Sequence, residues 1–292
     1  MKQKIYINLY GGLGDVALST PIFKELKLQF PDSKIIAIGR GKGQLEVLKH
    51  NPYIDTLRYL SLFYKFFYKF LRSAKIIKVI NINYGSLRPS YTYTKKASEI
   101  IAEMAGIKLT ETNIQIFLKE EEDIKAKTLL SNYVNPIIIH ITSIASKNQM
   151  WPHNNWNELV KSLPDHTFIQ LGLANELKVE GAVDLRGKTN IREGMALIKH
   201  AYSFVGVVSF FSHVTNAFNK KGVVFFGPSS LSVWGHENNI NISKNLICAP
   251  CVDFLKNAEC PYGKLCMQMI SVDEVKEAIE QIGLRQQKPV GI

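Results

Sequence analysis

The first group of residues that could do chemistry is a glycine-rich loop that ends in a carboxylate. This loop contains Gly11, Gly12, Gly14 and Asp15, and it directly follows an apolar run. Glycines let the backbone turn tightly and approach a ligand closely. Asp15 has two interpretations: it caps the helix that follows, or it serves as a general base toward a bound ligand. Because no G-x-G-x-x-G pattern can be read here, nicotinamide chemistry is weakly supported.

Polar loops after three later apolar runs form a second group, which suits the binding of phosphate. Hydroxyls and a lysine follow the run at residues 137–140, and such groups bind phosphate oxygens. The loops at residues 209–213 and 227–230 stand where helices begin, and two such helix starts indicate a nucleoside diphosphate. Each loop alone could instead be an ordinary polar loop. His213 has the alternative interpretation of a side chain packed inside the protein. The candidate residues are Thr142, Ser143, Lys147, Ser209, Ser212, His213, Gly227, Pro228 and Ser229.

The four cysteines of the chain lie close together in the sequence. Four thiolates could hold zinc or iron in a tetrahedral arrangement, and the spacing of the first pair is typical of a metal site. The second pair lacks that spacing, so free or buried thiols are an equal alternative and a disulfide is a minor one. The candidate metal ligands are Cys248, Cys251, Cys260 and Cys266.

Residues 62–72 combine aromatic and basic side chains at helical spacing. Phe66 and Phe70 would share one stripe of a helix, whereas Lys65 and Lys69 would share another. A helix with these two faces suits an acidic membrane surface. The alternative is a domain helix whose apolar face lies in the core, and the sequence leaves both interpretations open.

Strands and helices alternate along the chain, which predicts an α/β protein whose parallel sheets are covered on both faces. A hydroxyl before a first-turn proline, at residues 19–21, predicts a helix start. Because the pattern restarts after a charged stretch, we expect one domain at residues 1–134 and another at residues 135–292. Strands are expected at residues 5–9, 34–38, 76–82, 137–140, 167–171, 204–208 and 223–226, and helices at residues 157–163 and 191–201.

Composition places the chain among globular proteins and limits its partners. Its 292 residues suffice for two domains, and its ordinary hydrophobic and charged fractions exclude a disordered, collagen-like or coiled-coil protein. The net charge of +11 favours anionic partners such as phosphorylated small molecules. No signal peptide or membrane-spanning run is visible, which predicts a cytoplasmic location.

The order of these motifs resembles glycosyltransferase family 9, the ADP-heptose:lipopolysaccharide heptosyltransferases. Residues 11–21 look like the opening motif of the family, and the Trp-Pro pair at residues 151–152 looks like its central motif. The segment at residues 184–190 is the most specific match, and the cysteine spacing is similar to that of many members. The resemblance covers most of the chain.

This resemblance implies a GT-B architecture, in which two Rossmann-like domains face each other across a cleft. The N-terminal domain would bind the acceptor, and the C-terminal domain would bind the nucleotide-sugar donor. Transfer would proceed with inversion and without a catalytic cofactor or metal, with Asp15 as the base and the three glycines before it as an acceptor-side loop. The resemblance also makes Glu176 a donor-site residue, together with the phosphate-loop residues above.

The resemblance predicts an enzyme that moves a heptose from ADP-heptose or a related donor to a lipopolysaccharide or another surface glycan. Two alternatives remain. One is a protein heptosyltransferase, of the kind that modifies autotransporters, with a structural zinc or iron at the cysteines; the other is a non-catalytic protein that binds nucleotide sugars or nucleic acid. The expected partners are a nucleotide-diphosphate sugar and a glycan or glycoprotein acceptor, without nucleic acid, with residues 62–72 as a contact to the inner face of the cytoplasmic membrane.

Two departures from the family pattern concern the donor side. Residues 208–210 lack the acidic residue that many members carry before the Ser-His pair, and Phe210 stands where they have glycine. Gln149 stands where members usually have a lysine, two residues before the Trp-Pro pair.

Overall fold

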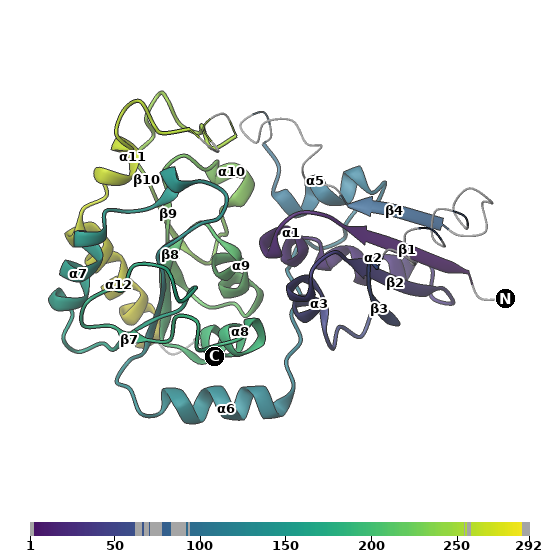
Figure 1. The fold of residues 1–292 in the computed structure, drawn as a ribbon, viewed down its shortest axis with the longest axis horizontal. Helices are drawn as coiled ribbons and strands as arrows, with labels where there is room; N and C mark the ends of the chain where they lie inside the picture. Colours follow the sequence, from purple (N-terminus) through teal and green to yellow (C-terminus); the bar gives the residue numbers. More distant parts are fainter. Residues whose placement is uncertain are drawn as a thin grey trace. The chain divides into compact units, whose positions relative to one another are not determined.

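The computed structural model describes most of the chain as two compact units (Figure 1). The first unit comprises residues 1–88 and 95–119, and the second comprises residues 89–94 and 120–292. Within these bounds the structure describes residues 3–61, 66, 70, 78–82, 92, 94–253, 255 and 258–287.

The first unit is built on a four-stranded parallel sheet with the strand order β3-β2-β1-β4. In β1 (Lys4–Leu9) and β2 (Lys34–Gly39), five consecutive residues are buried, which means that both faces of these strands are covered. The apolar runs expected at residues 5–9 and 34–38 are therefore confirmed as strands. The remaining elements of the unit are β3 (Thr56–Tyr59), β4 (Lys78–Ile82), α1 (Leu13–Leu18), α2 (Thr20–Gln29), α3 (Lys42–Leu48) and α5 (Ala97–Met104).

The helix start expected at residues 19–21 is confirmed, with Ser19 as the N-cap of α2 and a proline in its first turn. The hydroxyl of Ser19 does not cap α2; it donates to the carbonyl oxygen of Val16 at 2.8 Å. The reason is that α1 runs directly into α2, so a carbonyl group at the end of α1 needs a donor.

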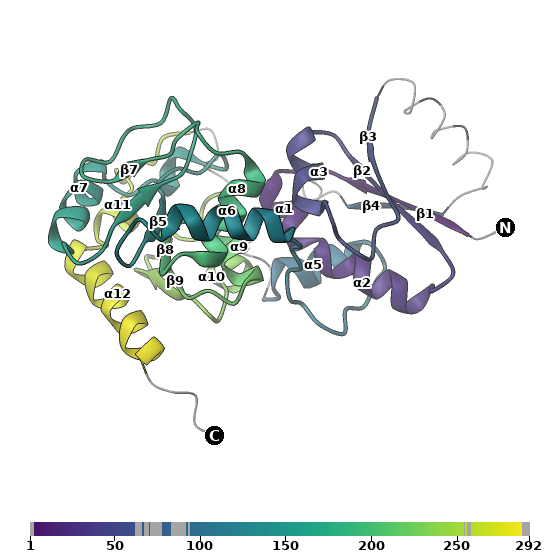
Figure 2. The ribbon, with the colours of Figure 1, turned by 90° about the horizontal axis from the view of Figure 1, so that it is seen from below.

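The second unit is built on a six-stranded parallel sheet with the strand order β10-β9-β8-β5-β6-β7. Helices α7 and α12 pack together on one side of this sheet, and α8 and α9 pack together on the other (Figure 1, Figure 2). The four strands expected here are confirmed to within one residue at each end. The elements are β5 (Ile137–His140), η3 (Lys147–Gln149), α7 (His153–Ser162), β6 (Phe168–Gln170), β7 (Val183–Asp184), α8 (Ile191–His200), β8 (Ser203–Val207), α9 (Phe210–Ala217), β9 (Gly222–Phe226), α10 (Leu231–Trp234), β10 (Ile240–Ser243), α11 (Leu265–Gln268) and α12 (Val272–Gln287).

The strand order reverses at one place in each sheet, and folds of this kind bind ligands at such switch points, beyond the carboxyl ends of the strands. In the first sheet, β1 is followed by β2 and β3 on one side, whereas β4 lies on the other side of β1. In the second sheet, β5 is followed by β6 and β7 on one side, whereas β8 lies on its other side. The loops after β1, β5 and β8 therefore stand at the two switch points.

Helix α6 (Glu120–Leu130) belongs to the second unit, whereas the domain boundary predicted at residues 134 and 135 places it in the first. The reason is its packing against α8. Arg192 donates to the carboxylate of Glu122 at 2.5 and 2.6 Å, and Lys199 and His200 both reach Asp123 at 2.7 Å. These contacts lie between residues about 70 positions apart, which a sequence pattern does not reveal.

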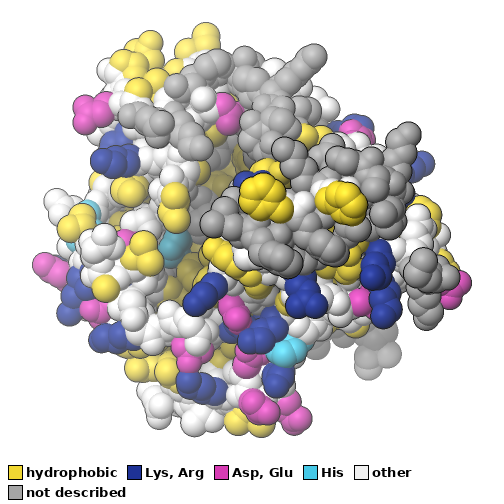
Figure 3. Space-filling view, turned by 45° about the vertical axis from the view of Figure 1, so that its right-hand side comes forward, with side chains coloured by type: hydrophobic (Ala, Val, Ile, Leu, Met, Phe, Trp, Pro, Cys, Tyr) yellow, Lys and Arg dark blue, Asp and Glu magenta, His cyan; other side chains and the backbone are white. Residues whose placement is uncertain are grey.

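The predicted membrane-facing segment at residues 62–72 lies outside the described residues, apart from two of its members. Phe66 and Phe70 are described, and their exposed fractions are 76% and 68%. Within the described ranges, no helix has the length and apolar character to cross a membrane. On the face of the molecule in Figure 3, Lys and Arg side chains are scattered among Asp and Glu side chains.

Candidate functional site

The switch point of the second sheet brings the ends of β5 and β8 into direct contact. The imidazole of His140, the last residue of β5, lies with its Nδ1 atom 3.0 Å from the Oγ atom of Ser209. The ring of Phe211 meets the same imidazole edge-on, at 5.0 Å between centroids. Burial lowers the pKa of His140 to about 4, so its ring is neutral at pH 7. This contact joins two loops that the sequence analysis assigned to phosphate binding.

Gln149 of η3 joins the same loops to a third. Its Oε1 atom accepts a hydrogen bond from the Ser143 hydroxyl at 2.9 Å, and its Nε2 atom donates to the Ser229 hydroxyl at 2.7 Å. The side chain is buried, with an exposed fraction of 3%. Sequence analysis named this residue only as a departure from a family pattern, and its partner Ser229 is 80 positions away. Ser143 and Ser229 are therefore brought together, as expected for one binding site.

The start of α9 carries the next two candidates, and the structure gives each of them an internal partner. Ser209 is the N-cap, and the Ser212 hydroxyl donates to the Ser209 carbonyl at 2.7 Å. His213 is buried, and its Nδ1 atom lies 2.8 Å from Nε2 of His236. Burial, and secondly the nearby His236, lower the pKa of His213 well below its ordinary value. Sequence analysis missed His236, because only the fold places it beside α9.

The loop at residues 227–229, after β9, is held by residues 251, 252 and 267 of the cysteine-bearing segment (residues 248–267). The carbonyl oxygen of Pro228 accepts hydrogen bonds from the backbone N–H groups of Cys251 and Val252, both at 2.9 Å. A Cβ atom added to Gly227 would lie 2.3 Å from Sδ of Met267, so the absence of a side chain permits this close packing. The shape of a candidate donor loop thus depends on the cysteine segment behind it.

Glu176 lies in the loop after β6, and its carboxylate stabilises this loop through a hydrogen bond to the loop backbone. Its Oε1 atom accepts from the backbone N–H of Leu173 at 2.9 Å. Its Oε2 atom is buried and has no hydrogen-bond partner among the residues that the structure describes. Gly172 has a φ of +147°, and a Cβ atom there would lie 2.3 Å from this oxygen, so only glycine leaves room for the carboxylate. A carboxylate oxygen with spare hydrogen-bonding capacity is suited to a ligand hydroxyl.

Arg186 supports the Glu176 loop from the segment that most specifically matched the family pattern. Its guanidinium donates twice to the carboxylate of Asp184, at 2.8 and 2.9 Å, and also to the carbonyl oxygen of Glu176. The hydrogen bonds from Arg186 lower the pKa of the Asp184 carboxyl far below its ordinary value. Sequence analysis quoted this segment without giving Arg186 a role, which the contact with Glu176 now supplies.

In the first unit, the glycine loop and Asp15 stand at the carboxyl end of β1. The Asp15 Oδ2 atom accepts from the backbone N–H of Gly12 at 2.7 Å, which is the capping arrangement of α1. Gly11 has a φ of +91°, and a Cβ atom there would lie 2.2 Å from the same oxygen. The helix-capping interpretation of Asp15 is thus observed, and its catalytic role stays a prediction. Gly14 lies within α1.

Gln44 of α3 and Arg40 of the loop after β2 both contact this turn. The Gln44 amide donates to the carbonyl oxygen of Gly11 at 2.8 Å and accepts from the backbone N–H of Arg40 at 2.6 Å. The Arg40 guanidinium lies over the ring of Tyr10, 3.6 Å from its centroid. Sequence analysis singled out neither Gln44 nor Arg40, since their roles depend on β1 and β2 being neighbours.

The remaining phosphate-loop candidates are less constrained. Thr142 is partly buried after β5, and the side chain of Lys147 in η3 is exposed. Asn148, between Lys147 and Gln149, donates through its buried amide to the carbonyl oxygens of Leu255 and Ala258 at 3.1 and 2.9 Å. The short helix η3 is therefore tied to the cysteine-bearing segment on one side.

The four cysteines are free thiols, so the disulfide alternative is not observed. Burial, and secondly the nearby Cys251, Cys248 and Cys260, raise the pKa of Cys266 to about 11. In the part of the chain that the structure covers, however, no three His, Cys, Asp or Glu side chains are arranged to hold a metal ion. The metal site therefore stays a prediction.

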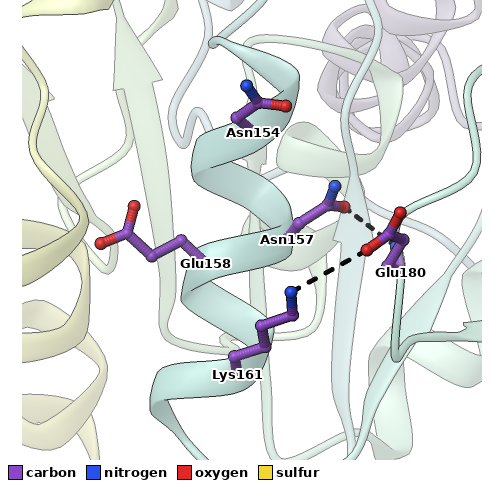
Figure 4. Close-up of a pocket in the computed structure, with 5 residues that line it drawn as sticks. All are labelled: Asn154, Asn157, Glu158, Lys161 and Glu180. Atoms are coloured by element: carbon purple, nitrogen blue, oxygen red, sulfur yellow. Dashed lines mark hydrogen bonds and ion pairs between the residues drawn. The ribbon is translucent and has the colours of Figure 1, made fainter.

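A surface depression of about 390 Å³ lies elsewhere in the second unit, beside α7 (Figure 4). The backbone N–H of Glu180 donates to Asn157 at 2.9 Å, and the Glu180 carboxylate pairs with Lys161 at 3.9 Å. This site contains none of the residues that the sequence analysis selected, and it is formed by α7 and the segment that precedes β7. Its lining residues are Asn154, Asn157, Glu158, Lys161 and Glu180.

Comparisons with known proteins concern the family and the fold of the chain. A model of glycosyltransferase family 9 (heptosyltransferase) matches residues 86–261. The solved structure of a glycosyltransferase of family 9 from Veillonella parvula DSM 2008 is 18% identical with a TM-score of 0.74, and the match covers 97% of each chain. The structure of the E. coli ADP-heptose lipopolysaccharide heptosyltransferase II is 16% identical with a TM-score of 0.76, and the match covers 98% of this chain and 100% of that one.

A third solved structure of similar fold contains iron. The iron-containing dodecameric glycosyltransferase TibC from enterotoxigenic E. coli H10407 is 13% identical with a TM-score of 0.70, and the match covers 98% of this chain and 77% of that one. These structural likenesses show that the chain adopts the GT-B fold. A search of curated protein sequences gives no match.

Proposed function

The chain belongs to glycosyltransferase family 9, the heptosyltransferase family, and from this premise we propose that it transfers a heptose from ADP-heptose to a lipopolysaccharide or related surface glycan. That the chain is a glycosyltransferase follows from the family itself. The single observation that carries the finer proposal is the group of polar loops at the switch point after β5 and β8, which lies within the matched residues.

The proposal assigns the donor to the second unit. The diphosphate would be bound by Lys147, by the Ser229 hydroxyl and by backbone N–H groups of the loops after β5, β8 and β9. Glu176 would accept a hydrogen bond from a donor hydroxyl, because its Oε2 atom has no partner among the described residues. The donor-side residues are Thr142, Ser143, Lys147, Glu176, Ser209, Ser212, His213, Gly227, Pro228 and Ser229.

The acceptor is assigned to the first unit, with Asp15 as the catalytic base. The acceptor hydroxyl oxygen forms a bond to the anomeric carbon while the bond from that carbon to the phosphate oxygen breaks. The nucleoside diphosphate leaves with the bonding electron pair, and Asp15 takes the proton of the hydroxyl. Attack on the face opposite the leaving group inverts the configuration. Positive charge and N–H groups around the diphosphate stabilise the leaving group, so the proposal requires no catalytic metal.

The donor assignment is tested by titrating the purified protein with ADP-heptose, ADP-glucose and UDP-, GDP- and CMP-sugars. ADP-heptose is expected to bind most tightly. Glu176→Gln is expected to weaken that binding by about 10- to 100-fold, because a hydrogen bond to a charged group is lost. Asn157→Asp, in the depression beside α7, is the matched control and should leave the affinity unchanged. Preference for another nucleotide would contradict the donor assignment.

A second candidate function is favoured by the cysteines and by the likeness to TibC, an iron-containing glycosyltransferase. In that case the chain would glycosylate a protein, and a structural zinc or iron at the four cysteines would support the donor loop. Cys251 is the informative ligand, since its backbone N–H also holds Pro228.

Metal analysis of the purified protein separates these alternatives. If the cysteines hold a metal, about one zinc or iron atom per chain is expected, and Cys251→Ser should reduce that content strongly. Replacement of Ser162, a partly buried residue at the end of α7, by alanine is the control and should leave the metal content unchanged. A metal-free wild-type protein would end the metal proposal.

A further inference from the structure

We propose that Gln149 is a positioning residue that fixes the hydrogen-bonding direction of two serine hydroxyls in the donor site. The inference rests on the proposed function only in naming the diphosphate as the ligand. Its geometric basis is the buried amide that bonds Ser143 on one side and Ser229 on the other.

The orientation of the Gln149 amide follows from its third neighbour. The atom that contacts Ser229 also lies 3.5 Å from the carbonyl oxygen of Val208. A carbonyl oxygen can only accept, so the facing atom is the nitrogen Nε2. The oxygen Oε1 therefore faces Ser143 and can only accept from its hydroxyl.

This orientation gives the two serines opposite roles. The Ser143 hydroxyl donates its hydrogen to Gln149, so it can only accept a hydrogen bond from a ligand. A hydroxyl group of a sugar or a ribose could donate such a bond. Ser229 accepts from Gln149, so its own O–H remains free to donate, and this suits a phosphate oxygen. In the described part of the chain, the Ser229 hydroxyl donates to no other group.

Gln149 lies where a single side chain can bond to three loops at once. The three groups that it bonds follow β5, β8 and β9, which are consecutive neighbours in the sheet. Gln149 and Ser229 are both buried, with exposed fractions of 3% and 6%, so water does not compete effectively for these bonds. The loops are thereby set before the ligand arrives, which is the condition for strong electrostatic binding.

Inorganic pyrophosphate is the probe for the phosphate half of the proposal, because it contains neither a base nor a sugar and therefore reports on the phosphate contacts alone. Gln149→Glu preserves the shape of the side chain but presents only hydrogen-bond acceptors to Ser229. The Ser229 hydroxyl then donates to the new carboxylate and no longer to the ligand. The variant also adds a negative charge. Calorimetric titration at pH 7 is expected to show pyrophosphate affinity reduced about 10- to 100-fold. Gln149→Met, which adds no charge and bonds neither serine, should show a smaller loss of about tenfold or less.

Protonation of the carboxyl group introduced by Gln149→Glu restores the original pattern, since its O–H donates to Ser229 and its carbonyl accepts from Ser143. The ratio of the two dissociation constants, Gln149→Glu to wild type, should therefore shrink as the pH is lowered from 7 to 5, whereas the Gln149→Met ratio should not change. A merely structural role would not produce this difference. Thermal unfolding of each variant monitors the fold.

Two serine variants test the assigned directions. Ser229→Ala should weaken both pyrophosphate and ADP-heptose, whereas Ser143→Ala should weaken ADP-heptose more than pyrophosphate. Unchanged pyrophosphate affinity in Gln149→Glu, or a wild-type protein that does not bind pyrophosphate, would overturn the inference. If pyrophosphate behaves as expected but ADP-heptose is not bound, the donor assignment fails and the role of Gln149 stands.

Discussion

Asp15→Asn is expected to reduce sugar transfer by about 10²- to 10⁴-fold while the affinity for ADP-heptose stays within about twofold of the wild type. An amide cannot take the proton from the acceptor hydroxyl, so the chemical step fails. The asparagine oxygen can still accept from the backbone N–H of Gly12, which Asp15 does at 2.7 Å. The helix cap and the turn are therefore preserved, and the variant isolates the base from the cap.

The measurement is ADP release from ADP-heptose in the presence of a lipopolysaccharide acceptor that lacks heptose. Asp15→Ala serves as the comparison, since it removes both the base and the cap and should also lower the stability by about 1 kcal/mol. Full activity in Asp15→Asn would show that the carboxylate only caps α1. Loss of ADP-heptose binding in that variant would instead place Asp15 among the donor contacts.

Arg192→Met is expected to destabilise the second unit by about 2–3 kcal/mol, because it removes two charge-assisted hydrogen bonds to the Glu122 carboxylate. The Arg192 side chain is only 5% exposed, and its two nitrogens contact both carboxylate oxygens. Urea unfolding followed by circular dichroism should show a clearly lower midpoint with an unchanged slope.

Two further variants give this prediction its controls. Lys199→Met removes a partner of Asp123 in a more exposed ion pair and should cost only about 0–1 kcal/mol. The double variant Arg192→Met with Glu122→Met replaces the whole pair by apolar side chains and should recover most of the lost stability. A single Arg192 variant as stable as the wild type would mean that α6 is held to α8 by other contacts.

The sequence predicts those elements whose signal is local. Central strands such as β5 and β9 are continuous apolar runs because both of their faces are buried, and the runs mark their ends to within a residue. β3 is an edge strand with two exposed residues and a Thr-Leu-Arg-Tyr sequence, so no such run exists. β7 is only two residues long and leaves no pattern at all.

The same distinction applies to the candidate site. Glycines, hydroxyls and a carboxylate after apolar runs are visible in the sequence, and they occupy the strand ends as expected. Gln44, Gln149 and Arg186 are ordinary surface-type residues by composition, and only their neighbours in the folded units give them a role. Sequence patterns therefore identify candidate ligand-binding residues more easily than they identify the residues that position them.

The strictly parallel pairing in both sheets has a consequence for how the chain acquires its structure. Each parallel pair requires a crossover, so none of the strand pairs among the described residues can form as a local hairpin. The pairing of β1 with β4, where the amide of Asn8 donates to Asn81 at 2.9 Å, joins residues 73 positions apart. Contacts of such long sequence separation slow folding, because a large loop must close before any of them forms. Newly synthesised chains will therefore expose the edges of β1 and β5 for longer than a helical protein of this size would.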